Sequence, residues 1–183
     1  MPRLSNRTLR RTMALLDILT IPDQRLKTKC APLANVDGRV ARLMDDMLET
    51  MYKAPGIGLA APQIGVLERV IVVDVSDHKE GAKQPIAMVN PELIWTSDEL
   101  SVTNEGCLSI PEVYADVTRP AAVRVRYVDR AGEVREMDAD GLLSTCIQHE
   151  IDHLDGVLFI DHLSALKRNM IIRKMTKLKR TGG

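Results

Sequence analysis

Residues 148–156, which read Gln-His-Glu-Ile-Asp-His-Leu-Asp-Gly, constrain the fold and chemistry of this chain more than any other stretch. His149 and His153 are four residues apart, so on an α-helix they project from one face, about one turn from each other. Two imidazoles in this arrangement can hold one metal ion, and Glu150 between them can reach a water molecule on that ion. Two histidines also reach this spacing by chance on an ordinary helix. A third ligand is needed to decide between a metal site and a chance pairing.

Two familiar sources of a third ligand, both downstream, are missing. No glutamate follows Glu150, which excludes the metalloproteases that take their third ligand from a glutamate on a later helix. Other metalloproteases place a third histidine three residues after a glycine. Gly156 is in place for this, but Phe159 occupies the histidine position and His162 is out of register.

The cysteines offer two further sources. Cys146 shares the helical face of the histidines, but it lies seven residues before His153, about 10 Å along the axis, which is too far for bonds of about 2.0 to 2.3 Å. We interpret Cys146 as an apolar wall of a pocket. Cys107, in Glu-Gly-Cys-Leu-Ser, follows a glycine and suits a strand end where backbone comes close to something. Taken alone, this segment is more simply explained by a buried free cysteine.

Composition predicts one globular domain. The chain has 183 residues, 45% of them hydrophobic, and a formal net charge of zero, so no global charge favours nucleic acid or a membrane surface. No apolar run approaches a membrane span. The three cysteines are widely spaced and odd in number, which argues against a disulfide framework and for a reducing compartment.

Hydrophobic periodicity predicts an α+β fold, with antiparallel strands wrapped around one central helix that carries the metal ligands, and a C-terminal helix. Asp37 is positioned to cap an early helix with a core-facing stripe of Val40, Leu43, Met44, Met47, Leu48 and Met51. Strand patterns occupy residues 69–75, 86–95, 99–103 and 123–128, and the last turns into residues 133–137 as a hairpin. Asp140 can cap the metal helix, and Gly156 suits its C-terminal end.

The two ends of the chain are basic. Residues 1–13 carry four arginines and no acidic residue, and we interpret them as a disordered extension before a domain of residues 14–183. An organellar targeting segment is the alternative. Residues 163–180 predict a basic helix with an apolar side formed by Leu163, Leu166, Met170, Ile171, Met175 and Leu178. His78 lies in a polar loop and is assigned no role.

Three segments occur in a fixed order: residues 56–63 (Gly-Ile-Gly-Leu-Ala-Ala-Pro-Gln), residues 105–109 and the His149–His153 helix. Together they resemble the peptide deformylases, the hydrolases that remove the formyl group from the N-terminal methionine of newly made bacterial proteins. All three family motifs match without a substitution, and the resemblance extends from about Ala14 to the C-terminal basic helix. The basic extension before Ala14 departs from the family pattern, which leaves Met13 as an alternative start.

The resemblance implies a metal held by Cys107, His149 and His153, with a metal-bound hydroxide that attacks the formyl carbon. Glu150 would act as general acid and base. The backbone N–H of Leu108 and the amide of Gln63 would stabilise the oxyanion. The remaining implied residues are Gly58, which pairs with the extended substrate, Ile57, Leu142 and Cys146, which line the methionine pocket, and Glu105 with Arg119, which hold the cysteine strand.

The resemblance also implies the metal and the partners. Iron(II) is expected physiologically, and zinc(II), nickel(II) or cobalt(II) in purified protein. The substrates would be N-formyl-methionyl peptides, the basic C-terminal helix could contact ribosomal RNA, and a cytoplasmic monomer without membrane association is expected. Tyr114 lies near the substrate path, where other family branches carry different residues. Two other functions stay open: a metallopeptidase that uses the same ligands, and a homologue that binds formylated chains without cutting them.

Overall fold

The structure is a computed structural model that describes residues 14–77 and 81–181. The predicted extension, residues 1–13, and His78 therefore lie outside the described residues. The elements follow in the order η1 (Gln24–Lys27), α1 (Gly38–Lys53), β1 (Gly58–Ala60), η2 (Ala61–Ile64), β2 (Val70–Val73), β3 (Ile86–Thr96), β4 (Leu100–Cys107), β5 (Ile110–Pro120), β6 (Ala122–Val128), β7 (Val134–Asp140), α2 (Gly141–Leu154), η3 (Phe159–His162) and α3 (Ala165–Arg180).

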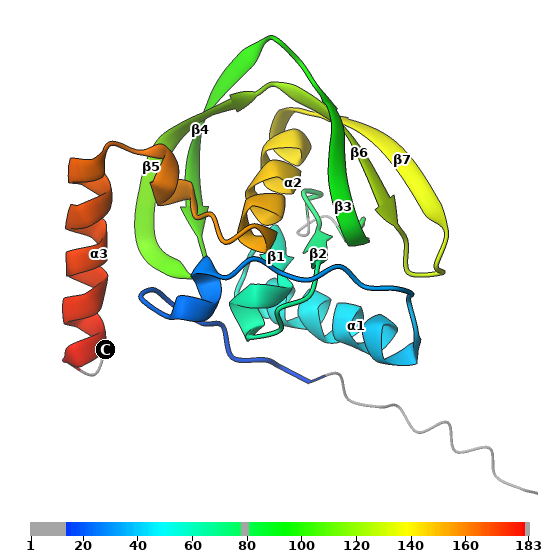
Figure 1. Cartoon of the computed structure of the whole chain (residues 1–183), viewed down its shortest axis with the longest axis horizontal. Helices are drawn as coiled ribbons and strands as arrows, with labels where there is room; N and C mark the ends of the chain where they lie inside the picture. Colours follow the sequence, from blue (N-terminus) through cyan, green and yellow to red (C-terminus); the bar gives the residue numbers. More distant parts are fainter. Residues whose placement is uncertain (1–13, 78–80, 182–183) are drawn as a thin grey trace, which may run out of the picture.

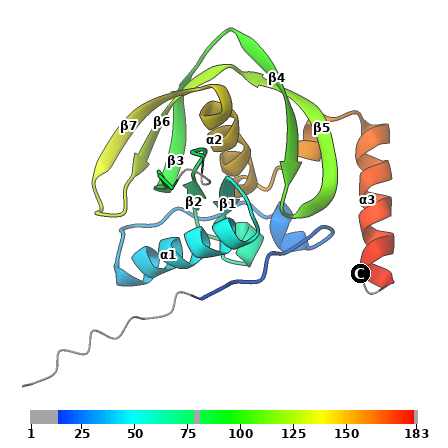
Figure 2. The ribbon, with the colours of Figure 1, turned by 180° about the vertical axis from the view of Figure 1, so that it is seen from behind.

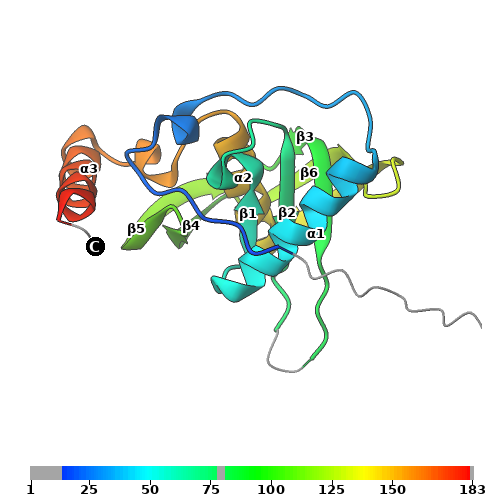
Figure 3. The same cartoon turned by 90° about the horizontal axis from the view of Figure 1, so that it is seen from below.

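The strands form two antiparallel sheets that arch over α2. One sheet has the order β1-β2-β3-β6-β7, and the other contains β4 and β5. Figures 1 and 2 show α2 beneath the arch formed by β3 to β7, with β1, β2 and α1 below it and α3 at the edge of the molecule. From below, α1 lies across β1 and β2 (Figure 3). The predicted α+β fold, with antiparallel strands around a central helix, is confirmed.

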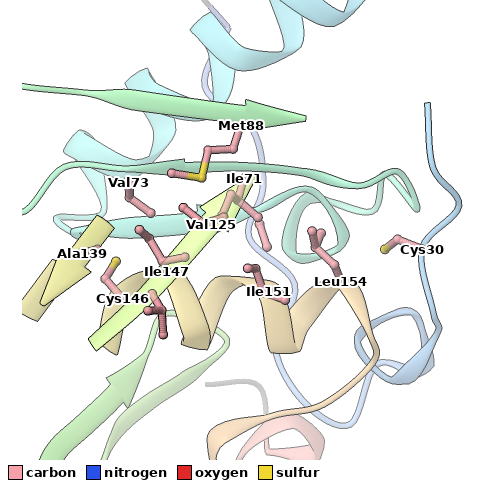
Figure 4. Packing of buried hydrophobic residues seen from close by; sticks show 12 residues of the cluster. Cys30, Ile71, Val73, Met88, Val125, Ala139, Cys146, Ile147, Ile151 and Leu154 are labelled. Carbon is pink, nitrogen blue, oxygen red and sulfur yellow. The ribbon is translucent and has the colours of Figure 1, made fainter. Parts of the chain in front are cut away.

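The central helix α2 is buried over most of its surface, including every residue from Ser144 to Ile151. Ile147, Ile151 and Leu154 recur at helical spacing and pack against Ile71 of β2 and other residues of one continuous core cluster (Figure 4). This apolar side fixes the helix against the larger sheet. The side that carries His149 and His153 is thereby turned toward β4.

The ends of α2 differ in how they are capped. Asp140 occupies the N-cap position as predicted, but its side chain makes no capping hydrogen bond. At the other end Gly156 has φ +72°, and an added Cβ would lie 2.6 Å from the carbonyl oxygen of Lys27. A glycine at this position is therefore required by both backbone conformation and space.

The early helix α1 forms as predicted. Asp37 accepts a hydrogen bond from the backbone N–H of Val40 at 2.9 Å, and the helix ends at Lys53, before the Ala-Pro-Gly segment. Met44, Met47 and Met51 are fully buried against β1 and β2. The methionine stripe is thus core packing.

One long strand was not predicted. β5 pairs with β4 along its whole length, from Leu100 opposite Pro120 to Cys107 opposite Ile110. The register shifts between Gly106 and Cys107, at the end of β4. This irregular end of the hairpin brings Cys107 to the metal helix.

The C-terminal helix α3 begins at Ala165 with Ser164 as its N-cap. Only part of its predicted apolar side is covered: Met175 is buried and packs with Leu163 and Ile171 in a core cluster with β5 and η3. Leu166 and Met170 are 73% and 62% exposed. No helix in the described part of the chain is both long and apolar enough to cross a membrane.

Candidate metal centre

The structure brings Cys107, His149 and His153 together. Their ligand atoms all lie within 4.8 Å of one another, and Cys107 Sγ is 3.3 Å from His153 Nε2. The thiol comes from the end of β4, and both imidazoles come from one face of α2. Because the histidines are one turn apart on a buried helix, their separation is fixed by helix geometry. Only the position of Cys107 depends on the packing of a second element.

The chemistry of this cluster fits a divalent transition metal. A thiolate with two imidazoles is a common donor set for zinc(II) and iron(II). Burial holds the pKa of His153 well below its usual value, which keeps the ring neutral and able to bind a metal. Within the described residues, His153 Nδ1 and Glu150 Oε2 are buried without a hydrogen-bond partner. Buried orphan polar atoms of this kind are typical of a site that binds an ion or water.

The orientation of His149 is set by Glu105. His149 Nδ1 lies 2.9 Å from Glu105 Oε2, so Nε2 is the ring nitrogen left for the cluster. Arg119 donates to the same carboxylate through Nε at 2.6 Å and Nη2 at 3.0 Å. Burial raises the pKa of Glu105, but the hydrogen bonds from His149 and Arg119 outweigh burial and lower it to about 2.

The titration of His149 reflects the same contacts. Burial lowers the pKa of this ring, whereas the acceptors Cys107 and Glu105 raise it by more, so that it lies well above its usual value. Metal binding would have to displace the second proton of the ring.

Glu150 lies beside the cluster in a nearly closed environment. The residue is 4% exposed, and burial raises the pKa of its carboxyl group to about 7. A carboxyl group with a pKa near neutrality can both accept and deliver a proton at cellular pH.

The backbone of β1 approaches Glu150 very closely. A Cβ added at Gly58 would overlap Glu150 Oε1 and lie 2.8 Å from Cys146 Sγ. The sequence predicted that Gly58 lets backbone approach a substrate. The structure shows a further reason for this glycine, which is the contact between β1 and α2.

Gln63 is held with its amide nitrogen toward the cluster. Its Oε1 accepts a hydrogen bond from the N–H of Ala60 at 2.9 Å, and Nε2 lies 3.5 Å from Cys107 Sγ and 3.1 Å from Ser109 Oγ. Ser109 is fully buried, and sequence analysis gave it no role. Gln63 and Leu108 both line the cavity described next.

A cavity of about 910 Å³ opens onto the cluster. Leu142 and Ile57 line it and are 51% and 39% exposed, so apolar surface faces the opening. Cys146 also lines it, donates through Sγ to the carbonyl oxygen of Ile57 at 3.4 Å, and lies outside the metal-ligand cluster. Tyr114 is at the rim with 70% of its surface exposed. The cavity therefore combines an apolar wall with a polar floor that carries the candidate metal ligands.

In the part of the chain that the structure describes, an α+β fold carries a three-residue candidate ligand cluster at an open cavity, an arrangement typical of metal-dependent hydrolases that keep one coordination position for water. Comparison with known proteins gives the family. The sequence model of polypeptide deformylase matches residues 15–169. The chain therefore belongs to the polypeptide deformylase family, whose members are amidohydrolase enzymes.

Relatives match nearly the whole chain. A peptide deformylase of Methylocella silvestris is 59% identical over 90% of this chain and 85% of its own length. A peptide deformylase of Rhizobium meliloti is 55% identical over 93% of this chain and 98% of its own length. The crystal structure of peptide deformylase from Ehrlichia chaffeensis superposes with a TM-score of 0.87 at 38% identity and covers 92% of this chain and 98% of that one. The Met-Ala-Ser bound structure of a class I type b peptide deformylase from Acinetobacter baumannii superposes with a TM-score of 0.77 at 32% identity. The match covers 83% of this chain and 100% of that one.

Sequence analysis missed the residues that surround the histidines. Asp152 binds Arg119 at 2.8 Å, His162 binds Asp152 at 2.8 Å, and Phe159 stacks on His149 with ring centroids 6.1 Å apart. The available signal was Asp152, an acidic residue inside the metal motif, whose partly buried side chain pairs with Arg119.

Proposed function

We propose that this protein removes the N-formyl group from the N-terminal methionine of newly synthesised polypeptides. The observation that carries the proposal is the Cys107, His149 and His153 cluster beside a buried Glu150 at the floor of an open cavity. Membership of the polypeptide deformylase family supports the same reaction.

Cys107, His149 and His153 would hold one divalent metal ion through Sγ and a nitrogen of each ring, and we propose iron(II) as the physiological ion. The ion, when bound, supplies Lewis acidity that makes water a nucleophile near neutral pH. Glu105 fixes the ring of His149, and the low pKa of Glu105 keeps that acceptor charged. The thiolate of Cys107 is an oxidisable ligand, so activity is expected to fall in air.

Glu150 would take a proton from the nucleophilic water and deliver it to the departing amine. Its pKa of about 7 supports both steps, and Oε2 has no other hydrogen-bond partner among the described residues. The N–H of Leu108 and Nε2 of Gln63 would donate to the oxyanion of the tetrahedral intermediate. Removing one such donor typically lowers the rate by about two to three orders of magnitude.

The substrate would bind as an extended strand along Gly58, with its methionine side chain against Ile57, Leu142 and Cys146. The partly exposed apolar surface of Leu142 and Ile57 supports an apolar side chain there. β1 lies at the edge of the five-stranded sheet, a position suited to strand addition. The Met-Ala-Ser complex of the Acinetobacter baumannii relative supports a peptide ligand of this kind.

The test compares formyl-Met-Ala-Ser with acetyl-Met-Ala-Ser and free Met-Ala-Ser, using protein purified without oxygen. Release of formate from the first peptide, with no acetate released from the second and no peptide bond cleaved in any of the three, supports the proposal. Cleavage of a peptide bond would instead indicate a metallopeptidase, and tight binding of the formyl peptide without formate release would indicate a binding protein.

We further propose that α3 contacts ribosomal RNA near the site where nascent chains emerge. The helix has basic residues without an acidic one, and Leu166 and Met170 on it are largely exposed. Replacing Arg173, Lys174 and Lys177 with glutamine should weaken ribosome binding and flatten its salt dependence. The control replaces Arg124, Arg126 and Arg135 with glutamine, which removes the same charge from β6 and β7. Equal binding by both triple variants would contradict the proposal.

A further inference from the structure

A chain of hydrogen bonds runs from His149 to the surface of the molecule. His149 Nδ1 contacts Glu105 at 2.9 Å, Arg119 Nη2 donates to the same Glu105 oxygen at 3.0 Å, and Arg119 Nη1 donates to Asp152 Oδ2 at 2.8 Å. The last link is His162 Nε2, which lies 2.8 Å from Asp152 Oδ2. Because an ionised carboxylate only accepts hydrogen bonds, His162 is the donor.

The inner part of this chain is closed to solvent and the outer part is not. Glu105 and Arg119 are each 5% exposed, whereas the side chains of Asp152 and His162 are 25% and 36% exposed. Asp152 is therefore the point at which the network could loosen, since its carboxylate could turn toward water instead of Arg119. His162 supplies the contact that opposes this rotation.

The element that carries His162 also contacts His149 directly. η3 follows the turn at Gly156 and lies against β4 and β5, and its first residue, Phe159, is 1% exposed and stacks on the ring of His149 at a centroid distance of 6.1 Å. Phe159, at the start of this short segment, thus contacts His149 directly. His162, at its end, is connected to His149 through the hydrogen-bond chain. The ring of His149 is thus contacted on its face by Phe159 and at Nδ1 by Glu105.

We propose that His162 is a positioning residue for the metal ligand His149, acting through Asp152, Arg119 and Glu105. Partners of a ligating histidine orient its ring and raise its basicity, and their loss typically weakens metal binding by about 10 to 100-fold. His162 is three contacts further from the ring, so a smaller effect follows. The inference rests on the proposed function, because it concerns the same three-ligand centre.

The test measures the affinity of the full-length chain for zinc(II) and cobalt(II) by competition with a chromophoric chelator. His162→Phe removes the donor and keeps a ring of similar size, and His162→Gln restores an N–H near the position of Nε2. We expect His162→Phe to weaken metal binding by about threefold to tenfold and His162→Gln to retain most of the affinity. The visible spectrum of the cobalt(II) form should shift in His162→Phe and stay unchanged in His162→Gln.

A matched control separates positioning from support of η3 in general. Lys27→Met removes the ion pair between Lys27 and Asp161. Asp161 lies in η3 next to His162, but this ion pair is not part of the hydrogen-bond chain. Thermal unfolding of each metal-free chain reports any loss of folded protein. Unchanged affinity in His162→Phe would overturn the proposal, as would equal losses in Lys27→Met or in His162→Gln. If the unsubstituted chain bound no metal or released no formate, the proposed function would fail first.

Discussion

Glu105 connects the candidate metal centre to the neighbouring strand β5. It is 5% exposed and joins His149 of α2 to Arg119 of β5. Its inward-facing charge is tolerated because Arg119 supplies a paired guanidinium in the same buried space. One carboxylate therefore serves both the packing of the β4–β5 hairpin and the orientation of a ligand.

Glu105→Gln should lower the free energy of unfolding of the metal-free chain at pH 7 by about 3 kcal/mol. The folded-state pKa of about 2 lies below the ordinary value of 4.5. Ionised Glu105 thus stabilises the fold above about pH 4.5, and this contribution disappears as the pH falls toward 2. Urea unfolding at several pH values checks this. A difference between the two proteins that grows on acidification would contradict it.

Gly58→Ala should disrupt the centre without touching any ligand. The added Cβ would overlap Glu150 Oε1 and force β1 away from α2. We expect a loss of about 1–3 kcal/mol in stability and of roughly 100-fold in kcat/KM. Gly38→Ala is the control, since its nearest neighbour would be 3.4 Å away at Arg42. Normal activity in Gly58→Ala would show that the approach of β1 is not needed.

At the level of helices and strands, the sequence predicted those elements that are determined by residues close together in the chain. The helix of Asp37 and the β6–β7 hairpin formed as predicted because their caps, turns and periodicity lie within a few residues. β5 was missed because its alternation is interrupted: Glu112 has φ +60°, and an arginine, Arg119, occupies an inward position. The strand pattern alone gives no reason for an inward arginine, which the structure explains by the ion pair of Arg119 with Glu105 of β4.

The two aspartates predicted as helix caps should differ in effect. Asp37→Ala removes a hydrogen bond to Val40 and should cost about 1 kcal/mol of stability. Asp140→Ala removes no capping hydrogen bond and should change stability by less than about 0.5 kcal/mol. Chemical denaturation of the two variants measures both. Equal losses would mean that Asp140 caps α2 in solution.

At the scale of the whole molecule, the centre forms where two sheets close over one helix. The sequence motif predicted the two histidines because they share a helix. Family resemblance indicated Cys107, which lies at the end of β4 in the two-stranded sheet. The outer contacts of Asp152 with Arg119 and His162 depend on how β5 and η3 return to α2. Apart from the aspartate inside the motif, no local pattern indicates that convergence.

The proposed mechanism depends on proton transfer by Glu150 beside a metal held by Cys107, His149 and His153. The most direct test is formate release from formyl-Met-Ala-Ser by unsubstituted and Glu150→Gln protein purified without oxygen, with metal content determined on the same samples. We expect about one metal ion per chain in both proteins, and a fall in kcat of about 10² to 10⁴-fold in the variant. Full activity in metal-loaded Glu150→Gln, or no bound metal in the unsubstituted protein, would contradict it.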